Sequence, residues 1–289
     1  RKTTRLPRHA IISRMNELSA SEPAPDLQRR FGGLQRLYGQ EGADRIRAAH
    51  VAVVGVGGVG SWAAEALARS GVAALTLIDL DNVAESNINR QIHALTGTLG
   101  QPKVHAMRQR IALIHPGCTV HDVEDFATPE NWPALLPDAV DGVIDACDQL
   151  RAKQALAAWA LQTRARFITC GAAGGKRQGE RVEIADLADV THDPLLAALR
   201  ARLRQAGCMA RPSAPGRSAA KRPARSGLPA VFSREAVAPP AACAAQPAGH
   251  DRNLNCHGYG STVTVTATFG MAAAGWMLQQ LACSAAHMR

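Results

Sequence analysis

The chain lacks paired cysteines. Its seven cysteines are scattered, and no two of them are spaced as Cys-x-x-Cys. An odd, unpaired set argues against a disulfide framework, which indicates a reducing compartment, and it argues against a structural zinc site. A long apolar run is also missing from residues 1–25, which are polar and basic, so we expect no secretory signal there. These absences predict a cytoplasmic protein with a flexible basic arm over residues 1–29.

Charged side chains are missing from residues 253–288, which contain no Asp, Glu, Lys or Arg. Such a stretch raises the question of a membrane span. Its Thr-rich start, Gln279 and Gln280 argue against one. The pattern favours a buried, strand-like segment followed by a C-terminal helix without stable transmembrane insertion, and it leaves peripheral membrane association open.

Acidic side chains are missing from residues 194–234, in a chain whose formal net charge is +9. The cations of this stretch are Arg200, Arg202, Arg204, Arg211, Arg217, Lys221, Arg222, Arg225 and Arg234. The first 30 residues add seven basic and three acidic side chains. Two interpretations stay open: a solvated, disordered loop, or a surface for an anionic partner such as nucleic acid.

Apolar segments alternate between strand-like and helix-like patterns along the first half of the chain. A strand, a helix and a second strand are predicted for HVAVVGVG, SWAAEALARSG and ALTLIDLD, which together form a βαβ unit and imply a parallel sheet. Further helices are predicted for PKVHAMRQRIALIHPG and RAKQALAAWALQTR, and further strands for CTVHDVED, DGVIDACD and RFITC. The expected fold class is α/β, a Rossmann-like, mainly parallel sheet flanked by helices.

The second half of the chain follows a mixed pattern. A strand is predicted for RVEIADLADV and an amphipathic helix with a basic face for DPLLAALRARLR. Residues 205–250 are rich in Ala, Pro, Gly and Arg, which predicts a long flexible insertion. We therefore expect one domain over residues 30–289, with a nucleotide-binding half at 50–175 and a mixed C-terminal half at 176–289.

A glycine-rich turn follows the first predicted strand. Gly55, Gly57 and Gly60 fit the G-x-G-x-x-G of a dinucleotide-binding turn, and Asp79 lies about 20 residues further on, where a ribose hydroxyl needs an acceptor. Gly55, Asp79 and Asp148 each follow a predicted strand, so they should meet at the carboxyl edge of the sheet. The glycines alone permit either NAD or ATP.

Two cations after the second strand favour ATP. An NAD enzyme has no need of a cation here, whereas a triphosphate that loses pyrophosphate requires positive charge. Arg90 and Lys103 supply that charge, and Asn87 adds a hydrogen-bond donor. The NAD oxidoreductase reading is correspondingly weakened.

Five tracts in order and spacing, GVGGVG, LIDLD, SNINRQ, LGQPK and VIDACD, resemble the ubiquitin-activating-type, ThiF/MoeB-like superfamily of ATP-dependent adenylating enzymes over residues 30–175. The resemblance implies that ATP and Mg²⁺ bind at these tracts. The implied ATP-binding residues are Gly55, Gly57, Gly58, Gly60, Asp79, Asp81, Ser86, Asn87, Arg90 and Lys103. It further implies that Asp148 holds the magnesium ion and that Arg90, Lys103 and Asp148 are catalytic. A non-catalytic scaffold of this fold would be expected to lose Arg90 or Asp148, and both are present.

Further tracts, among them RFGGLQRLYG, TCGAAGGK, DLADVTHDPL and AVFSREAV, are similar to the tRNA threonylcarbamoyladenosine dehydratase family over residues 30–277. This resemblance implies adenylation of the threonyl carboxylate of the modified adenosine next to the tRNA anticodon, followed by intramolecular cyclisation. The implied partners are tRNA, a second copy in a homodimer, and a cysteine desulfurase or sulfur-acceptor system. Sulfur-carrier activators usually carry two Cys-x-x-Cys pairs, which this chain lacks. The alternative is adenylation of the C-terminus of a ubiquitin-like sulfur carrier.

The sequence departs from these families at two places. Where the sulfur-carrier activators read Arg-Tyr-x-Arg, with the second Arg reaching the partner subunit's ATP site, this chain has RFGG, which leaves Arg30 or Arg36 for that role. Ala230 stands where the dehydratases carry a Cys, so Cys256 remains as a candidate reactive cysteine, although internal attack needs no thioester. The predicted tRNA contacts are Arg200, Arg204, Arg217, Lys221, Arg222 and Arg225.

Overall fold

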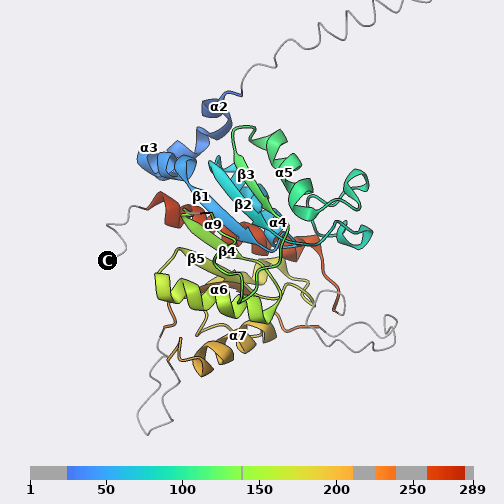
Figure 1. The fold of residues 1–289 in the computed structure, drawn as a ribbon, viewed down its shortest axis with the longest axis vertical. Coiled ribbons are helices and arrows are strands. Elements are labelled where there is room, and N and C mark those ends of the chain that lie inside the picture. The colour runs from blue at the N-terminus through green and yellow to red at the C-terminus, as the bar shows by residue number, and fades with distance from the viewer. Residues whose placement is uncertain (1–24, 138, 211–224, 239–258, 284–289) are drawn as a thin grey trace, which may run out of the picture.

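The structure is a computed structural model that describes residues 25–137, 139–210, 225–238 and 259–283. Within these ranges the chain forms a seven-stranded sheet in the order β3-β2-β1-β4-β5-β7-β6 (Figure 1). The strands are β1 (His50–Val54), β2 (Ala74–Ile78), β3 (Thr119–Val123), β4 (Gly142–Asp145), β5 (Phe167–Cys170), β6 (Val182–Asp186) and β7 (Pro229–Ser233). All neighbours pair in parallel except β6 and β7, which pair antiparallel. The predicted α/β class with a mainly parallel sheet is confirmed.

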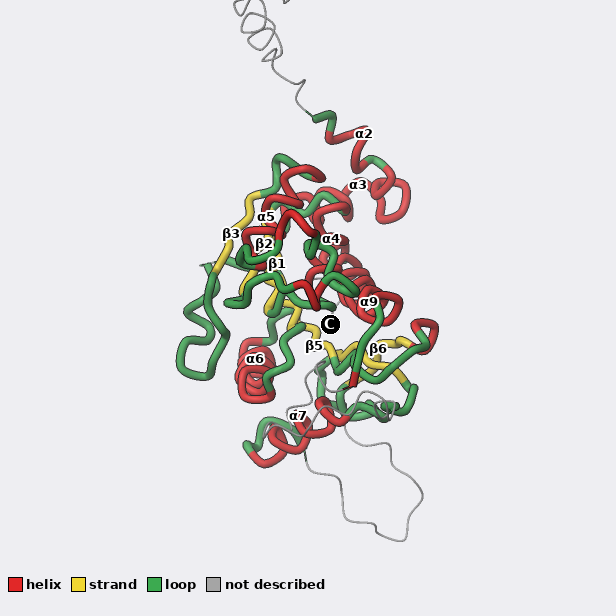
Figure 2. The backbone as a smooth tube through the Cα atoms, turned by 90° about the vertical axis from the view of Figure 1, so that its right-hand side faces the viewer, coloured by secondary structure: helices red, strands yellow, loops and turns green. Residues whose placement is uncertain are grey.

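Helices cover both faces of the sheet, as a mainly parallel sheet requires. They are α2 (Leu27–Phe31), α3 (Gly33–Ala48), α4 (Gly60–Arg69), α5 (Lys103–Ile114), α6 (Leu150–Thr163), α7 (Pro194–Gln205) and α9 (Val263–Ala282). Three single-turn helices, η1 (Glu85–Asn87), η2 (Thr96–Thr98) and η3 (Gly179–Arg181), lie in the connections. Figure 2 shows α4 and α9 on one side of the sheet and α6 on the other.

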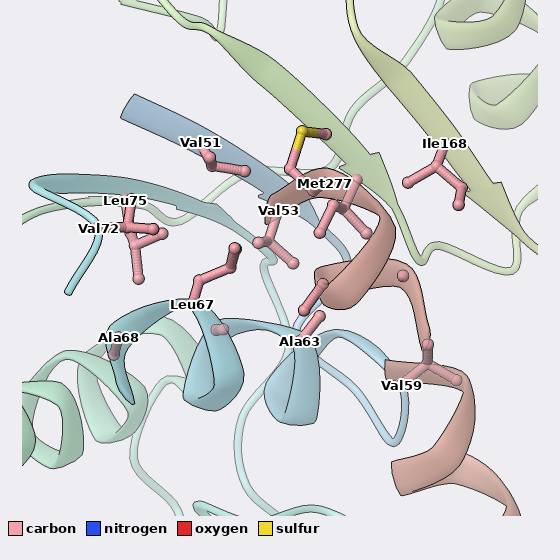
Figure 3. Packing of buried hydrophobic residues seen from close by; sticks show 14 of the residues in the cluster. Val51, Val53, Val59, Ala63, Leu67, Ala68, Val72, Leu75, Ile168 and Met277 are labelled. Carbon is pink, nitrogen blue, oxygen red and sulfur yellow. The ribbon is translucent and has the colours of Figure 1, made fainter. Parts of the chain in front are cut away.

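Strand β1 contributes side chains to both hydrophobic cores because successive side chains of a strand point to opposite faces. Val51 and Val53 join the core with α4 and α9, shown in Figure 3. Ala52 and Val54 join the second core with α6 and α7. All four side chains are buried. This is why the sequence of β1 reads as a continuous apolar run.

Helix α9 replaces the strand-like segment predicted near the C-terminus, so that prediction is wrong. Its β-branched Val and Thr residues have strand propensity, but the buried positions Val265, Phe269, Ala273 and Met277 recur every four residues and form a helical face against the sheet. Burial against α4 and the sheet explains the missing charges on this face, whereas the exposed face of α9, which includes Thr264, Met271 and Gln279, is uncharged without a packing reason. Among the described residues, no helix is both long and apolar enough to cross a membrane.

Strand β7 lies inside the range predicted as one flexible insertion, so the prediction for residues 205–250 is wrong between 225 and 238. Ala230, Val231 and Phe232 are buried, because β7 pairs with β5 and β6 inside the sheet. The short apolar run PAVFS is the local signal of this strand. Residues 211–224 and 239–250 of the range lie outside the described residues.

The strand order reverses between β1 and β4. From β1 the chain moves outward to β2 and β3, and it then returns to β4 on the other side of β1. Ligands of open α/β sheets bind in the crevice at the carboxyl ends of the strands beside such a reversal. Gly55 follows β1 and Asp148 lies three residues beyond the end of β4, so both lie at the edge of the sheet where such a ligand is expected.

Candidate active site

The glycines of the first turn are required for different reasons. Gly55 has φ +85°, and a Cβ there would lie 2.8 Å from the amide nitrogen of Cys147. A Cβ at Gly60 would lie 1.8 Å from the carbonyl oxygen of Gly55. These two positions are glycine because the turn packs against itself and against the end of β4.

Gly57 is not explained by contacts with other residues that the structure describes. The nearest described atom to a Cβ at Gly57 is Nε2 of Gln91, at 3.9 Å. A Cβ at Gly58 would meet Thr266 and Arg90 at 3.3 and 3.4 Å. The turn leads directly into the N-terminus of α4, which favours anions. A glycine with open space at this place is suited to the close approach of a phosphate.

Asp79 ties the end of β2 to the glycine turn. Its Oδ2 accepts a hydrogen bond from the amide of Val56 at 2.7 Å, and its Oδ1 accepts one from the amide of Asp81 at 2.9 Å. Burial raises the pKa of Asp79, while Lys103 and the two amide donors act in the opposite direction. Each carboxylate oxygen retains a second acceptor position, so the side chain can still accept from a ribose hydroxyl.

Lys103 lies beside these two carboxylates. Its Nζ donates to Asp81 Oδ2 at 2.7 Å and lies 4.0 Å from Asp79 Oδ1. The backbone brings them together, because the amide of Lys103 donates to the carbonyl of Asp81 and the amide of Val83 donates to the carbonyl of Gln101. The structure thus joins the LIDLD and LGQPK tracts, which are separated by about 20 residues in the sequence.

The SNINRQ tract forms the turn around η1. Arg90 is partly exposed, and its Nη1 donates to the carbonyl of Ser86 at 2.7 Å and to Oδ1 of Asn89 at 2.9 Å. Asn87 is buried, and its Oδ1 accepts from the amide of Ala84 at 2.9 Å. The Asn87 oxygen therefore closes this turn, and Ser86 is exposed.

Asp148 is exposed in the loop after β4. In the part of the chain that the structure describes, no group of three or more His, Cys, Asp or Glu side chains is placed to hold a metal ion. Mg²⁺ is commonly held by one or two carboxylates together with substrate phosphates and waters. A single exposed carboxylate beside the crevice fits that mode of binding and does not fit an all-protein metal cage.

A buried ion pair below this loop was not foreseen from the sequence. Asp145 Oδ2 accepts from Lys153 Nζ at 2.9 Å and from Thr169 Oγ1 at 2.7 Å, and both charged side chains are fully buried. Asp145 Oδ1 accepts from the amide of Cys147 at 3.2 Å. Burial raises the pKa of the Cys147 thiol, with Asp145 next in effect, so this thiol stays protonated at neutral pH. The only sequence signal was an acid inside the apolar run VIDACD.

Lys176 is a second unforeseen cation. Its buried Nζ donates to the carbonyls of Glu235, His192 and Ser233 at 2.9, 3.2 and 3.2 Å. Glu235 in return accepts from the amides of Arg177 and Gln178. This clasp joins the loop after β5 to the ends of β7 and of the loop before α7. None of its residues is among those predicted to bind the nucleotide.

The predicted tRNA contacts are divided between structural and exposed positions. Arg200 Nη1 donates to the carbonyls of Leu187 and Val190 at 3.0 and 2.9 Å, and burial lowers its pKa. Arg204 is half-buried and Arg225 is exposed. Arg217, Lys221, Arg222 and the candidate cysteine Cys256 lie outside the described residues.

The two arginines considered for a role at the partner subunit's site also differ. Arg30 Nη1 donates to the carbonyl of Ile114 within its own chain at 2.7 Å. Arg36 is exposed. Arg36 therefore retains more freedom to reach a second copy.

Known proteins resemble this chain over most of its length. The sequence profile of the ThiF family matches residues 28–284. The tRNA threonylcarbamoyladenosine dehydratase of Haemophilus influenzae is 40% identical over 258 residues, which cover 89% of this chain and 94% of that protein. The crystal structure of E. coli tRNA N6-threonylcarbamoyladenosine dehydratase in complex with ATP is 40% identical, covers 91% of this chain and 97% of that chain, and has a TM-score of 0.77. The structure of the same E. coli enzyme in complex with AMP is 39% identical, covers 90% of this chain and 98% of that chain, and has a TM-score of 0.76. The chain therefore belongs to the ThiF family.

Proposed function

We propose that this protein is an ATP-dependent tRNA threonylcarbamoyladenosine dehydratase. The observation that carries the proposal is the similarity to dehydratases over nearly their whole length, including one whose structure holds ATP. The arrangement of Lys103 between Asp79 and Asp81 at the carboxyl edge supports it, because it sets a cation and a ribose acceptor beside the glycine turn.

The nucleotide lies in the crevice between the glycine turn and the end of β4. Asp79 accepts hydrogen bonds from the ribose, and Gly57 and Gly58 allow the backbone to approach the phosphates. Arg90 and Lys103 carry the positive charge that stabilises the phosphates as pyrophosphate leaves. Asn87 and the carbonyl of Ser86 stabilise the turn around η1. Asp81 holds the side chain of Lys103.

Adenylation makes a poor electrophile reactive. An oxygen of the threonyl carboxylate attacks the α-phosphorus of ATP, the bond to the bridging oxygen breaks, and pyrophosphate leaves. The neighbouring carbamoyl group then attacks the carbonyl of the acyl adenylate and loses a proton, and AMP leaves with the former carboxylate oxygen. The product therefore lacks one water relative to the substrate.

The second step depends mainly on positioning. An intramolecular attack gains an effective molarity that is equivalent to roughly 7 to 11 kcal/mol. For this reason the mechanism requires no thioester, and Cys256 has no obligatory role in it. The protonated Cys147 is likewise unsuited to act as a nucleophile, since the thiolate is the reactive form.

Magnesium belongs to the same proposal. Asp148 would hold the ion together with phosphate oxygens, and the bound ion would supply charge neutralisation at the departing pyrophosphate. The exposure of Asp148 leaves its carboxylate accessible from the crevice.

The size and charge of a tRNA substrate bear on where it would bind. A tRNA needs phosphate contacts beyond the one nucleoside in the site, and residues 194–234 carry cations and no acid. Arg225, which is exposed, and the partly exposed Arg202 and Arg204 of α7 begin such a surface. The proposed assembly is a homodimer in the cytoplasm, in which Arg36 reaches the second copy. The proposed protein partner is a cysteine desulfurase.

The deciding experiment supplies the purified protein with ATP, Mg²⁺ and tRNA that carries threonylcarbamoyladenosine. Mass spectrometry of the nucleosides should show a product lighter by one water, with AMP and pyrophosphate released in equal amounts. Pyrophosphate exchange that depends on a small ubiquitin-like protein and not on tRNA would instead support the sulfur-carrier alternative. Tight NAD binding without ATP binding would contradict both.

A further inference from the structure

The main-chain carbonyl of Arg90 is approached by side chains from two different helices. Trp62 Nε1, on α4, donates to this oxygen at 2.9 Å. Thr266 Oγ1, on α9, lies 3.4 Å from the same oxygen and 3.5 Å from the carbonyl of Val263 in its own helix, so its single proton is shared between these two acceptors. Trp62 is 28 residues away in the sequence and Thr266 is 176 residues away, so neither belongs to the SNINRQ tract.

The two helices that carry these donors are locked together at this point. A Cβ at Gly270, one turn after Thr266, would lie 2.4 Å from the carbonyl of Val59 and 2.8 Å from Cβ of Trp62. Only a glycine allows α9 to approach the start of α4 this closely. Thr266 is 1% exposed and packs beside Gly58 of the glycine turn. The donors, the turn and Arg90 therefore form one packed unit.

The side chain of Arg90 continues from this fixed point. The guanidinium is held by Ser86 and Asn89, and Nδ2 of Asn89 donates to the carbonyl of Ser261, just before α9, at 3.0 Å. Residues before and within α9 thus contact both Asn89 and Arg90. A shift of the Arg90 carbonyl would move the root of the guanidinium toward or away from the crevice.

We propose that Trp62 and Thr266 are positioning residues that set the place of the Arg90 guanidinium for ATP activation, with Trp62 the stronger of the two. This inference rests on the proposed role of Arg90 at the phosphates. Small displacements of a charged group cost turnover because its stabilisation of the transition state depends on its position. Trp62 and Thr266 do not themselves touch the nucleotide in this account.

The test uses the full chain with Trp62→Phe and Thr266→Val, singly and together. Phe retains an aromatic ring but lacks the indole N–H and part of the indole volume, a loss that the Trp159→Phe control shares, and Val retains the branched shape but lacks the hydroxyl. The matched controls are Trp159→Phe on α6, whose ring stacks edge-on against Trp132, and Thr268→Val on α9, whose hydroxyl donates to the carbonyl of Thr264 in its own helix. The readouts are kcat and KM for ATP in tRNA cyclisation, with thermal midpoints measured for every variant.

We expect the double variant to lower kcat about tenfold, with KM for ATP within about twofold and each control within about twofold of the parent. The same pair of substitutions is then introduced into Arg90→Ala and Arg90→Lys, with rates measured under single-turnover conditions. In Arg90→Ala the pair should change the rate by less than about twofold, because the group being positioned is gone. In Arg90→Lys, which retains a cation, part of the effect should remain.

The outcomes separate this inference from the proposed function. If the pair lowers the rate equally in the parent and in Arg90→Ala, Trp62 and Thr266 act on the fold in general and the inference is wrong. A double variant with parental kcat also overturns it. If Arg90→Ala itself turns over like the parent, the assigned role of Arg90 is wrong, and the inference is lost with it.

Discussion

Two lysine–carboxylate pairs stand at the carboxyl edge of the same sheet and differ in access to solvent. Lys103 after β2 bonds to Asp81, whose side chain is 55% exposed, whereas Lys153 on α6 and Asp145 in β4 are both 0% exposed. The ion-pair distances are nearly equal, 2.7 and 2.9 Å. Because the Lys103 side chain is itself only 8% exposed, the two pairs differ mainly in the exposure of the carboxylate, and we infer that this exposure is what leaves Lys103 free to bind a ligand.

The physical reason lies in solvation. Burial opposes protonation of Lys153, but Asp145, Cys147 and Cys170 together outweigh it, so the pKa of Lys153 is raised and its ammonium group stays charged. Neither charge can turn to another partner without leaving an unpaired ion in the core. Lys103 can exchange part of its interaction with Asp81 for a phosphate, because water solvates the released carboxylate.

The largest expected effect is on the buried ion pair of Lys153 and Asp145. Lys153→Ala should lower the free energy of unfolding by roughly 3 to 5 kcal/mol, because it leaves Asp145 buried and unpaired. Chemical denaturation of the parent and the variant measures this loss. Lys153→Met combined with Asp145→Asn should recover much of it, since no buried charge remains. A single variant as stable as the parent would show that the unpaired Asp145 is tolerated in the core and that Lys153 is not needed for stability.

Variants of the more exposed residues at the same edge should lose activity and keep their stability. Arg90→Ala and Asp148→Ala should each lower turnover by about 100-fold with little change in the thermal midpoint, since both side chains are at least partly exposed. Lys103→Ala should lower turnover similarly. Steady-state cyclisation and circular dichroism on the same samples separate activity from folding. A folded Arg90→Ala with near-parental turnover would remove that residue from the site.

A smaller effect is expected beyond the crevice, where tRNA phosphates are to be held. Affinity for tRNA should fall at least about tenfold between low and physiological salt, because bound cations displace counterions. Changing Arg217, Lys221, Arg222 and Arg225 together to Ala should weaken tRNA binding and flatten this dependence, while ATP binding stays unchanged. Filter binding over a salt series gives the slopes. Equal slopes for the parent and the fourfold variant would indicate that tRNA is held elsewhere.

The smallest expected effect concerns pH. His93 is 1% exposed near Lys103, and burial lowers its pKa to about 4, with Lys103 and Arg110 acting in the same direction. A base with a lowered folded pKa contributes stability above its unfolded value of 6.5 and loses it as the pH falls toward 4. We expect a loss of about 1 kcal/mol between pH 6.5 and 5.5 from this group. Denaturation at several pH values gives the free energy of unfolding as a function of pH. Between pH 6.5 and 5.5 this free energy should fall more for the parent than for His93→Phe, and equal pH dependence in the two proteins would contradict the assignment.

Much of the fold could be predicted from local patterns. The strands around Val53, Leu77 and Ile144 are short apolar runs, and the helix α4 has a clear apolar spacing. Two segments could not be predicted in this way. Helix α9 carries β-branched residues whose local preference is overruled by packing on the sheet, and β7 is a five-residue strand within a stretch of Ala, Pro and Arg.

Local sequence patterns were enough to predict a nucleotide site at the carboxyl edge of the sheet. Glycine spacing, the acid after β2 and the cations of the next tract depend on the covalent order of residues and on the periodicity of strands and helices, which act over short distances. Which charges are buried and which stay near solvent depends on how the helices and the sheet pack together. Asp145 and Lys153 are sealed in the core, Lys103 is left beside an exposed partner, and Trp62 and Thr266 meet at Arg90, because burial and contact between distant segments arise only when the helices pack on the sheet.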